Sequence, residues 1–139
     1  GTGKTEEVRM FGAAARYGKA GAQYRNVDVS TRIEGASPHR LVGILFEELL
    51  TSIALTAAAT RNRDLERRGE SQSRSLAILQ ALDSSLDFEK GGEIAGMLAS
   101  VYGEVRRLLL AGVRENRPEP LEEARKLIGE ISSAWDAIG

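Results

Sequence analysis

The chain contains no cysteine, which excludes disulfides and thiolate metal sites and fits a reducing compartment. It has a single histidine, His39, which by itself cannot form a histidine metal cluster. Aromatic residues make up only 5% of the sequence, too few for a base-stacking surface. The 19 basic and 20 acidic residues lack the basic excess typical of nucleic-acid binders. We therefore expect no metal, no cofactor and no nucleic-acid partner.

Long apolar runs are also missing from the sequence. We find no run that approaches the roughly 20 residues of a membrane span, and the N-terminus lacks the apolar core of a secretory signal. We therefore expect a cytoplasmic protein without membrane insertion. A length of 139 residues fits one domain, which is large enough to bury a core without a disulfide or metal.

The first part of the chain differs in composition from the rest. Residues 1–36 are rich in glycine, alanine and tyrosine and show no sustained apolar stripe. We interpret them as a mobile N-terminal arm, with a short helix near residues 11–24, preceding a bundle domain over residues 37–139. The position of Met10 suggests a natural start there, which would make residues 1–9 a remnant of added sequence.

Apolar residues recur with the helical period over four later segments. The first helix should begin at Ser37-Pro38, because serine is a good N-cap and proline is favoured at the first helical position, and end near Arg61. A polar connection over residues 61–68, a turn over residues 87–92 and a break over residues 116–120 separate the others. The stripes are Val42, Leu45, Phe46, Leu49, Leu50, Ile53 and Ala57; Leu76, Leu79, Leu82 and Leu86; Ile94, Leu98, Val101, Val105, Leu108 and Leu109; Leu121, Ala124, Ile128, Ile131 and Trp135.

These helices predict the fold class. No segment of useful length alternates with a period of two, so we expect no strands. Amphipathic helices joined by short connections pack as antiparallel neighbours around one core. The sequence therefore predicts an all-α protein, an antiparallel four-helix bundle.

No residue pattern predicts catalysis. Gly3-Lys4-Thr5 resembles the end of a phosphate-binding loop, but the glycine and strand that must precede it are not there. His39 is interpreted as a surface residue without a positioned catalytic partner. The pairs Glu47-Glu48 and Glu122-Glu123 diverge by about 100° on a helix and form no shared acid–base site. We expect a protein that is not an enzyme.

Small and apolar residues on otherwise polar helix faces are more informative. Ile44 and Leu55 point away from the main stripe of the first helix, and four residues lie opposite the stripe of the third: Gly96, Ala99, Gly103 and Leu110. Glycine costs about 1 kcal/mol in a helix relative to alanine, so two glycines on one outer face need a reason. Isolated exposed apolar residues are normal in proteins. Because two helices share the anomaly, we favour a groove that binds a partner helix.

Four blocks in series resemble the FliS family of flagellar export chaperones. The first is Val29-Ser30-Thr31 with residues 36–47 (ASPHRLVGILFE), in which Phe46 stands where the family usually has tyrosine. The others are residues 78–87 (ILQALDSSLD), residues 91–108 (GGEIAGMLASVYGEVRRL) and residues 121–135, which close with Trp135. The resemblance covers residues 24–138.

The resemblance implies a chaperone that binds the disordered C-terminal segment of flagellin and prevents premature polymerisation before export. The expected contacts are Ile44, Phe46, Leu55, Gly96, Ala99, Gly103 and Leu110, with Tyr24 and Val29 from the arm. Of the helical contacts, Phe46 is the weakest because it lies toward the core. We also expect residues 11–29 to fold back over the groove in the free protein and to be displaced by flagellin. Without its partner, the protein is expected to be a monomer or a homodimer. The alternative is a helical adaptor or regulator that binds another component of the export apparatus or itself.

Overall fold

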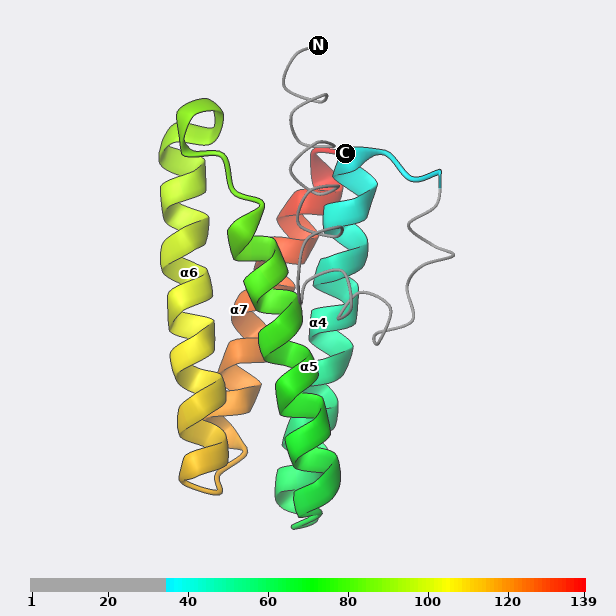
Figure 1. Ribbon diagram of the computed structural model, residues 1–139, viewed down its shortest axis with the longest axis vertical. Coiled ribbons are helices and arrows are strands. Elements are labelled where there is room, and N and C mark those ends of the chain that lie inside the picture. The colour runs from blue at the N-terminus through cyan, green and yellow to red at the C-terminus, as the bar shows by residue number, and fades with distance from the viewer. Residues whose placement is uncertain (1–34) are drawn as a thin grey trace.

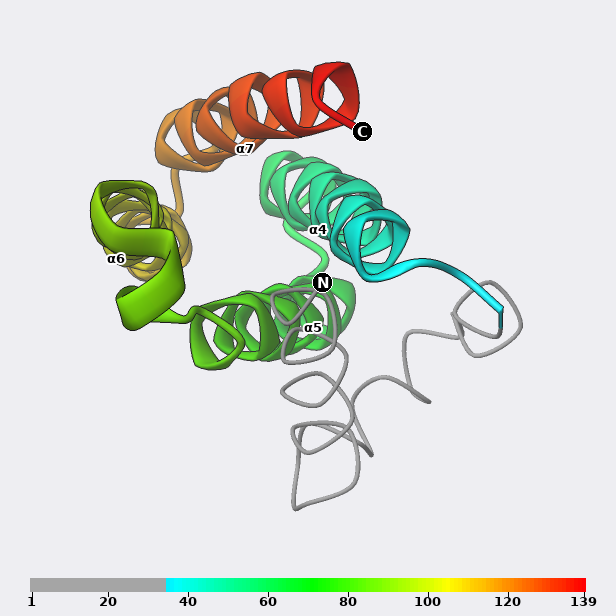
Figure 2. The same ribbon diagram turned by 90° about the horizontal axis from the view of Figure 1, so that it is seen from above.

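The computed structural model describes residues 35–139, which form four α-helices. These are α4 (Pro38–Arg61), α5 (Leu65–Ser84), α6 (Phe88–Arg114) and α7 (Glu119–Ala137), and no strand occurs among the described residues (Figure 1). α4 packs against α5 and α7, and α6 packs against the same two helices. Seen from above, α4 and α6 therefore lie diagonally across the bundle (Figure 2). The predicted all-α antiparallel four-helix bundle is confirmed.

The start of α4 follows directly from its sequence. The Ser37 hydroxyl accepts a hydrogen bond from the Arg40 backbone N–H at 3.1 Å, and Pro38 occupies the first turn. This arrangement satisfies one of the otherwise unpaired N–H groups at the helix end. The helix ends at Arg61. Both bounds agree with the sequence prediction.

α4 is the central core helix. By length and composition it could cross a membrane, a property that we did not expect from the sequence. Half of its most apolar stretch is buried inside the bundle, however. Leu45, Leu49 and Ile53 are each at most 1% exposed. The apolar character of α4 is thus accounted for by the core that it forms with its neighbours.

Two predicted contact residues of α4 belong to this core. Ile44 is 1% exposed and Phe46 is fully buried, so neither offers its side chain to a partner. For Ile44, the prediction of an outward-facing side chain was wrong. The physical reason is that α5 and α7 cover two sides of α4, which makes its buried surface wider than a single helical stripe.

Small polar side chains fill the seam between α4 and α5. The Ser52 hydroxyl donates to the Ser71 carbonyl at 2.9 Å and lies 2.7 Å from the Ser75 hydroxyl. Thr56 and Thr60 each donate to the carbonyl four residues earlier in α4. All five residues are buried. Because their hydroxyls are paired and their side chains are short, the two helices can approach each other without leaving buried polar groups unsatisfied.

The helix connections are shorter than the sequence predicted. The prediction of a polar connection over residues 61–68 was wrong, because only Asn62 to Asp64 separate α4 from α5. Arg63 has a φ of 55°, and the Asp64 side chain caps α5 by accepting from the Arg67 N–H. Likewise, α6 begins at Phe88, inside the predicted turn, and bends at Gly92, which has a φ of 51°. The break before α7 agrees with the prediction.

Trp135 joins the last helix to the first. Its ring stacks on His39 with ring centroids 4.4 Å apart and planes 7° apart, and its Nε1–H donates to the His39 carbonyl at 2.8 Å. Phe46 meets the same indole edge-on at 6.1 Å. At the opposite end of the bundle, Arg61 forms an ion pair with Glu122. α7 is therefore fixed to α4 near both of its ends.

Candidate partner-binding site

The α6 outer face is defined by Gly96, Ala99, Gly103 and Leu110. At 100° per residue these four residues fall within one sector of the helix. A Cβ atom added at Gly96 or Gly103 would meet no heavy atom within 4 Å, and Leu110 is 43% exposed. Ala99 is half-buried. The structure thus brings these four predicted residues together on one open helix surface.

Two arginines flank the α6 outer face, one on each side. The Arg106 guanidinium donates to the Gln80 side chain of α5 at 3.0 Å, and Arg107 Nε donates to Glu104 at 3.0 Å. The hydrogen bond from Arg107 lowers the pKa of Glu104, which is therefore ionised at neutral pH. We did not predict these arginines as site residues. Each lies three or four residues from both Gly103 and Leu110, a spacing that places it beside them on the helix and that could have identified it.

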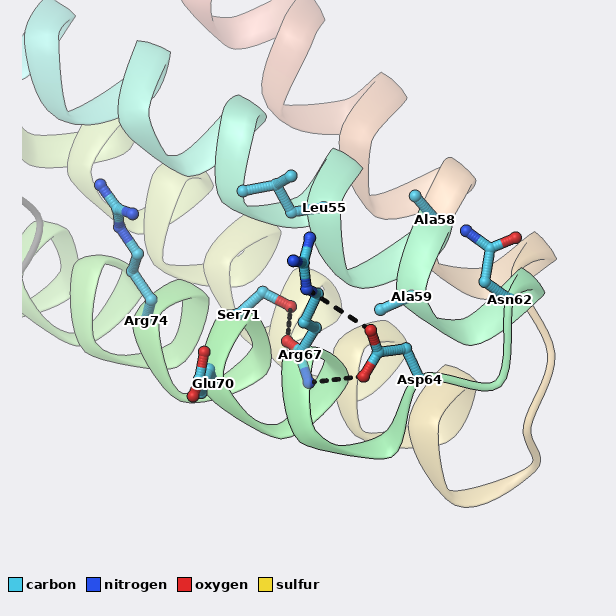
Figure 3. Close-up of a pocket in the computed structure, with 9 residues that line it drawn as sticks. All are labelled: Leu55, Ala58, Ala59, Asn62, Asp64, Arg67, Glu70, Ser71 and Arg74. Carbon is cyan, nitrogen blue, oxygen red and sulfur yellow. Dashed lines mark hydrogen bonds and ion pairs between the residues drawn. The ribbon is translucent and has the colours of Figure 1, made fainter.

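Leu55 lies in a separate groove between α4 and α5. Its side chain is 51% exposed, and it lines a depression of about 440 Å³ together with alanines of α4 and charged residues of α5. Figure 3 shows Leu55, Ala58 and Ala59 on the α4 side, facing Arg67 and other residues of α5. Arg67 is held by Asp64 at 3.5 Å. This Leu55 groove therefore has an apolar floor and a charged rim.

The Leu55 groove and the α6 outer face do not form the single groove that the sequence suggested. α4 and α6 are diagonal in the bundle, and α5 lies between their exposed sides (Figure 2). A partner that contacts both surfaces must therefore cross α5. The predicted arm contacts Tyr24 and Val29 lie outside the described residues.

The described residues provide no arrangement for acid–base or metal chemistry. No group of three or more histidine, cysteine, aspartate or glutamate side chains in residues 35–139 is placed to hold a metal ion. Burial raises the pKa of the Tyr102 phenol well above its ordinary value, and the nearby Asp83 carboxylate adds to the shift. Tyr102 therefore stays neutral and serves as a core residue.

The two faces of α6 predict opposite effects of adding a methyl group. Gly103→Ala should raise the free energy of unfolding by up to about 1 kcal/mol, because the site is open and alanine favours helix. Gly112→Ala should lower it by roughly 1–3 kcal/mol, because its Cβ would lie 2.7 Å from Leu121 Cγ and 3.1 Å from the Arg117 carbonyl oxygen. Urea denaturation measures the free energy of unfolding of both variants. If the two substitutions changed it by the same amount, the conclusion that Gly103 lies on an open face would be contradicted.

Comparison with known proteins identifies the family. The sequence model of the family described as "Flagellar protein FliS" matches residues 20–139. The flagellar secretion chaperone FliS of Salmonella typhimurium is 35% identical over 117 residues, which cover 83% of this chain and 86% of that protein. The flagellar secretion chaperone FliSB of Pseudomonas aeruginosa is 31% identical over 120 residues, covering 86% and 95%. The chain belongs to the FliS family of flagellar proteins.

Proposed function

We propose that this protein is a flagellar export chaperone that binds the C-terminal segment of flagellin in the cytoplasm and acts without catalysis. The names of its relatives support a chaperone role in flagellar secretion. The observation that carries the proposal is the α6 outer face, where Gly96 and Gly103 leave the helix backbone accessible. A partner helix can approach such a surface closely, and Leu110 adds apolar area to the contact.

The arrangement of the two surfaces suggests a path for the flagellin segment. An amphipathic segment of flagellin self-associates when its apolar stripe is exposed, so a chaperone must cover that stripe without folding the whole subunit. The Leu55 groove and the α6 outer face lie on different sides of α5. We propose that the segment contacts both surfaces by crossing α5. Such extended binding offsets the cost of ordering the segment by burying a large area.

Calorimetric titration with the C-terminal segment of the organism's own flagellin tests this function. We expect saturable binding with one segment per protein and a negative change in heat capacity, since apolar surface is buried. The full chain is used, and its folding is checked by circular dichroism. Absence of binding by the folded protein would contradict the flagellin assignment and favour the adaptor alternative.

The proposal also keeps the predicted cap formed by residues 11–29, which lies outside the described residues. If this segment covers the flagellin surface in the free protein, flagellin must displace it. Deleting residues 1–29 should then tighten binding, because the cost of displacement is removed. The same titration measures the effect. Unchanged or weaker binding by the truncated protein would argue against the cap while leaving the flagellin site itself intact.

A further inference from the structure

A third surface, mostly apolar, lies at the end of the bundle where α4 begins and α7 ends. A depression of about 150 Å³ opens there between all four helices. Its walls include Val42 of α4, Leu86 in the connection between α5 and α6, Leu98 of α6 and Trp135 of α7. The indole of Trp135 is held in place by its stacking on His39. We call this feature the end depression.

Three large apolar side chains near the start of α6 are exposed at this end. Phe88 is 58% exposed, Met97 is 59% exposed, and Ile94, which lines the end depression, is 63% exposed. Ile94 was predicted to face the core, and that prediction was wrong. The residue lies beside the bend at Gly92, at the end of the bundle, where fewer described residues cover it. An exposed apolar residue beside an apolar depression, as Ile94 is here, is typical of an interaction site.

The end depression is distinct from the α6 outer face. Ile94 and Gly103 are nine residues apart, which places them about 180° apart around the helix. Leu55 lies toward the other end of the bundle, where α4 ends and α5 begins. A flagellin segment that covers the Leu55 groove and the α6 outer face therefore leaves Ile94 accessible.

The end of the bundle that holds the end depression carries more acidic than basic side chains. Residues 36–44, 80–99 and 130–139 form this end of the bundle and contain two basic side chains, Arg40 and Lys90. The remaining described residues hold eleven basic and ten acidic side chains and are nearly neutral. The acidic residues at this end, which we call the acidic rim, are Asp83, Asp87, Glu89, Glu93, Glu130 and Asp136, and of these Asp87 lines the depression itself.

We propose that the end depression binds a second protein through a short basic segment. One large apolar side chain of that segment enters between Ile94 and Trp135, and lysines or arginines beside it face the carboxylates of the rim. The apolar contact supplies most of the binding energy, and the complementary charge selects basic partners and speeds association. The proposal goes beyond flagellin binding, since it assigns this end of the bundle to another partner of the chaperone.

Selection from a random peptide display library on the full-length protein tests the proposal. The library is first depleted on the Ile94→Glu variant, so that only peptides that need this site remain. We expect enriched peptides to carry one large apolar residue flanked by lysine or arginine. The chain has one tryptophan, so the best peptide should also change the fluorescence of Trp135 on titration.

Charge variants then test the acidic rim with that peptide. The double variant Glu89→Lys/Glu93→Lys should weaken binding at least about fivefold, because both exposed carboxylates are replaced by cations. The matched control is Glu123→Lys, an exposed glutamate at the start of α7 near the opposite end, which should bind as the wild type does. Thermal denaturation confirms that each variant is folded.

Five results would overturn the proposal. Enriched peptides without a basic preference, or equal binding by the folded charge variant, would remove the role of the rim. Competition by the flagellin segment would assign the end depression to the flagellin surface. Peptide binding only after deletion of residues 1–34 would show that the chain's own N-terminal segment is the occupant. Self-association that Ile94→Glu abolishes, measured by sedimentation, would show that a second copy is the occupant.

Discussion

Replacing Phe46 by alanine is expected to lower the free energy of unfolding by about 3–5 kcal/mol, the usual cost of removing a buried aromatic ring. Phe46 is fully buried in α4 and meets Trp135 edge-on at 6.1 Å. The cavity left by the ring would lie between α4 and α7, next to the contact that joins the last helix to the first. Urea denaturation monitored by circular dichroism measures the loss.

Leu55→Ala serves as the control for Phe46→Ala. It also shortens a large apolar side chain of α4, but Leu55 is 51% exposed, so its loss should cost less than about 1 kcal/mol. Comparing the stabilities of the two variants distinguishes a residue of the core from a residue that contacts a partner. A Phe46→Ala protein as stable as the wild type, with weakened flagellin binding, would restore Phe46 as a contact and contradict its burial in the core.

Replacing Leu110 by glutamate is expected to weaken flagellin binding about 10- to 100-fold. The side chain is 43% exposed in the free protein, and covering the rest of it in a complex contributes roughly 1–2 kcal/mol, to which the burial of a new carboxylate adds a penalty. Gly103→Glu should have a similar effect, because its side chain would occupy the space that the partner helix needs. The calorimetric titration with the flagellin segment gives both dissociation constants.

Arg114→Glu is a suitable control for these two changes. Arg114 is exposed in the last turn of α6, one turn past Leu110 on the same side of the helix, and its contact with Glu115 at 3.4 Å is a surface ion pair. Its replacement should leave flagellin binding within about twofold of the wild type, since exposed charges contribute little. If Leu110→Glu and Gly103→Glu also bound normally while folded, the α6 outer face would not be the flagellin site.

The sequence alone was sufficient to predict those features of the helices that depend only on residues close together in the chain. Ser37 and Pro38 fix the start of α4, because an N-cap hydroxyl and a proline without an N–H both suit the first turn. The stripe of α7 was correct for Leu121, Ala124 and Ile128, which are all buried. The open positions Gly96 and Gly103 were also recognised, because helix propensity makes glycine unusual there. Each of these signals is contained within a few turns of one segment.

Only the tertiary structure decided which helix faces are covered. Ile44 has the angle of an outward residue on an isolated helix, but it is buried because α4 has neighbours on two sides. Ile94 has the angle of a core residue, but it is exposed because it lies at the end of the bundle beside the bend at Gly92. A helical pattern gives the direction of a side chain from its own axis, whereas burial depends on which other helices lie in that direction.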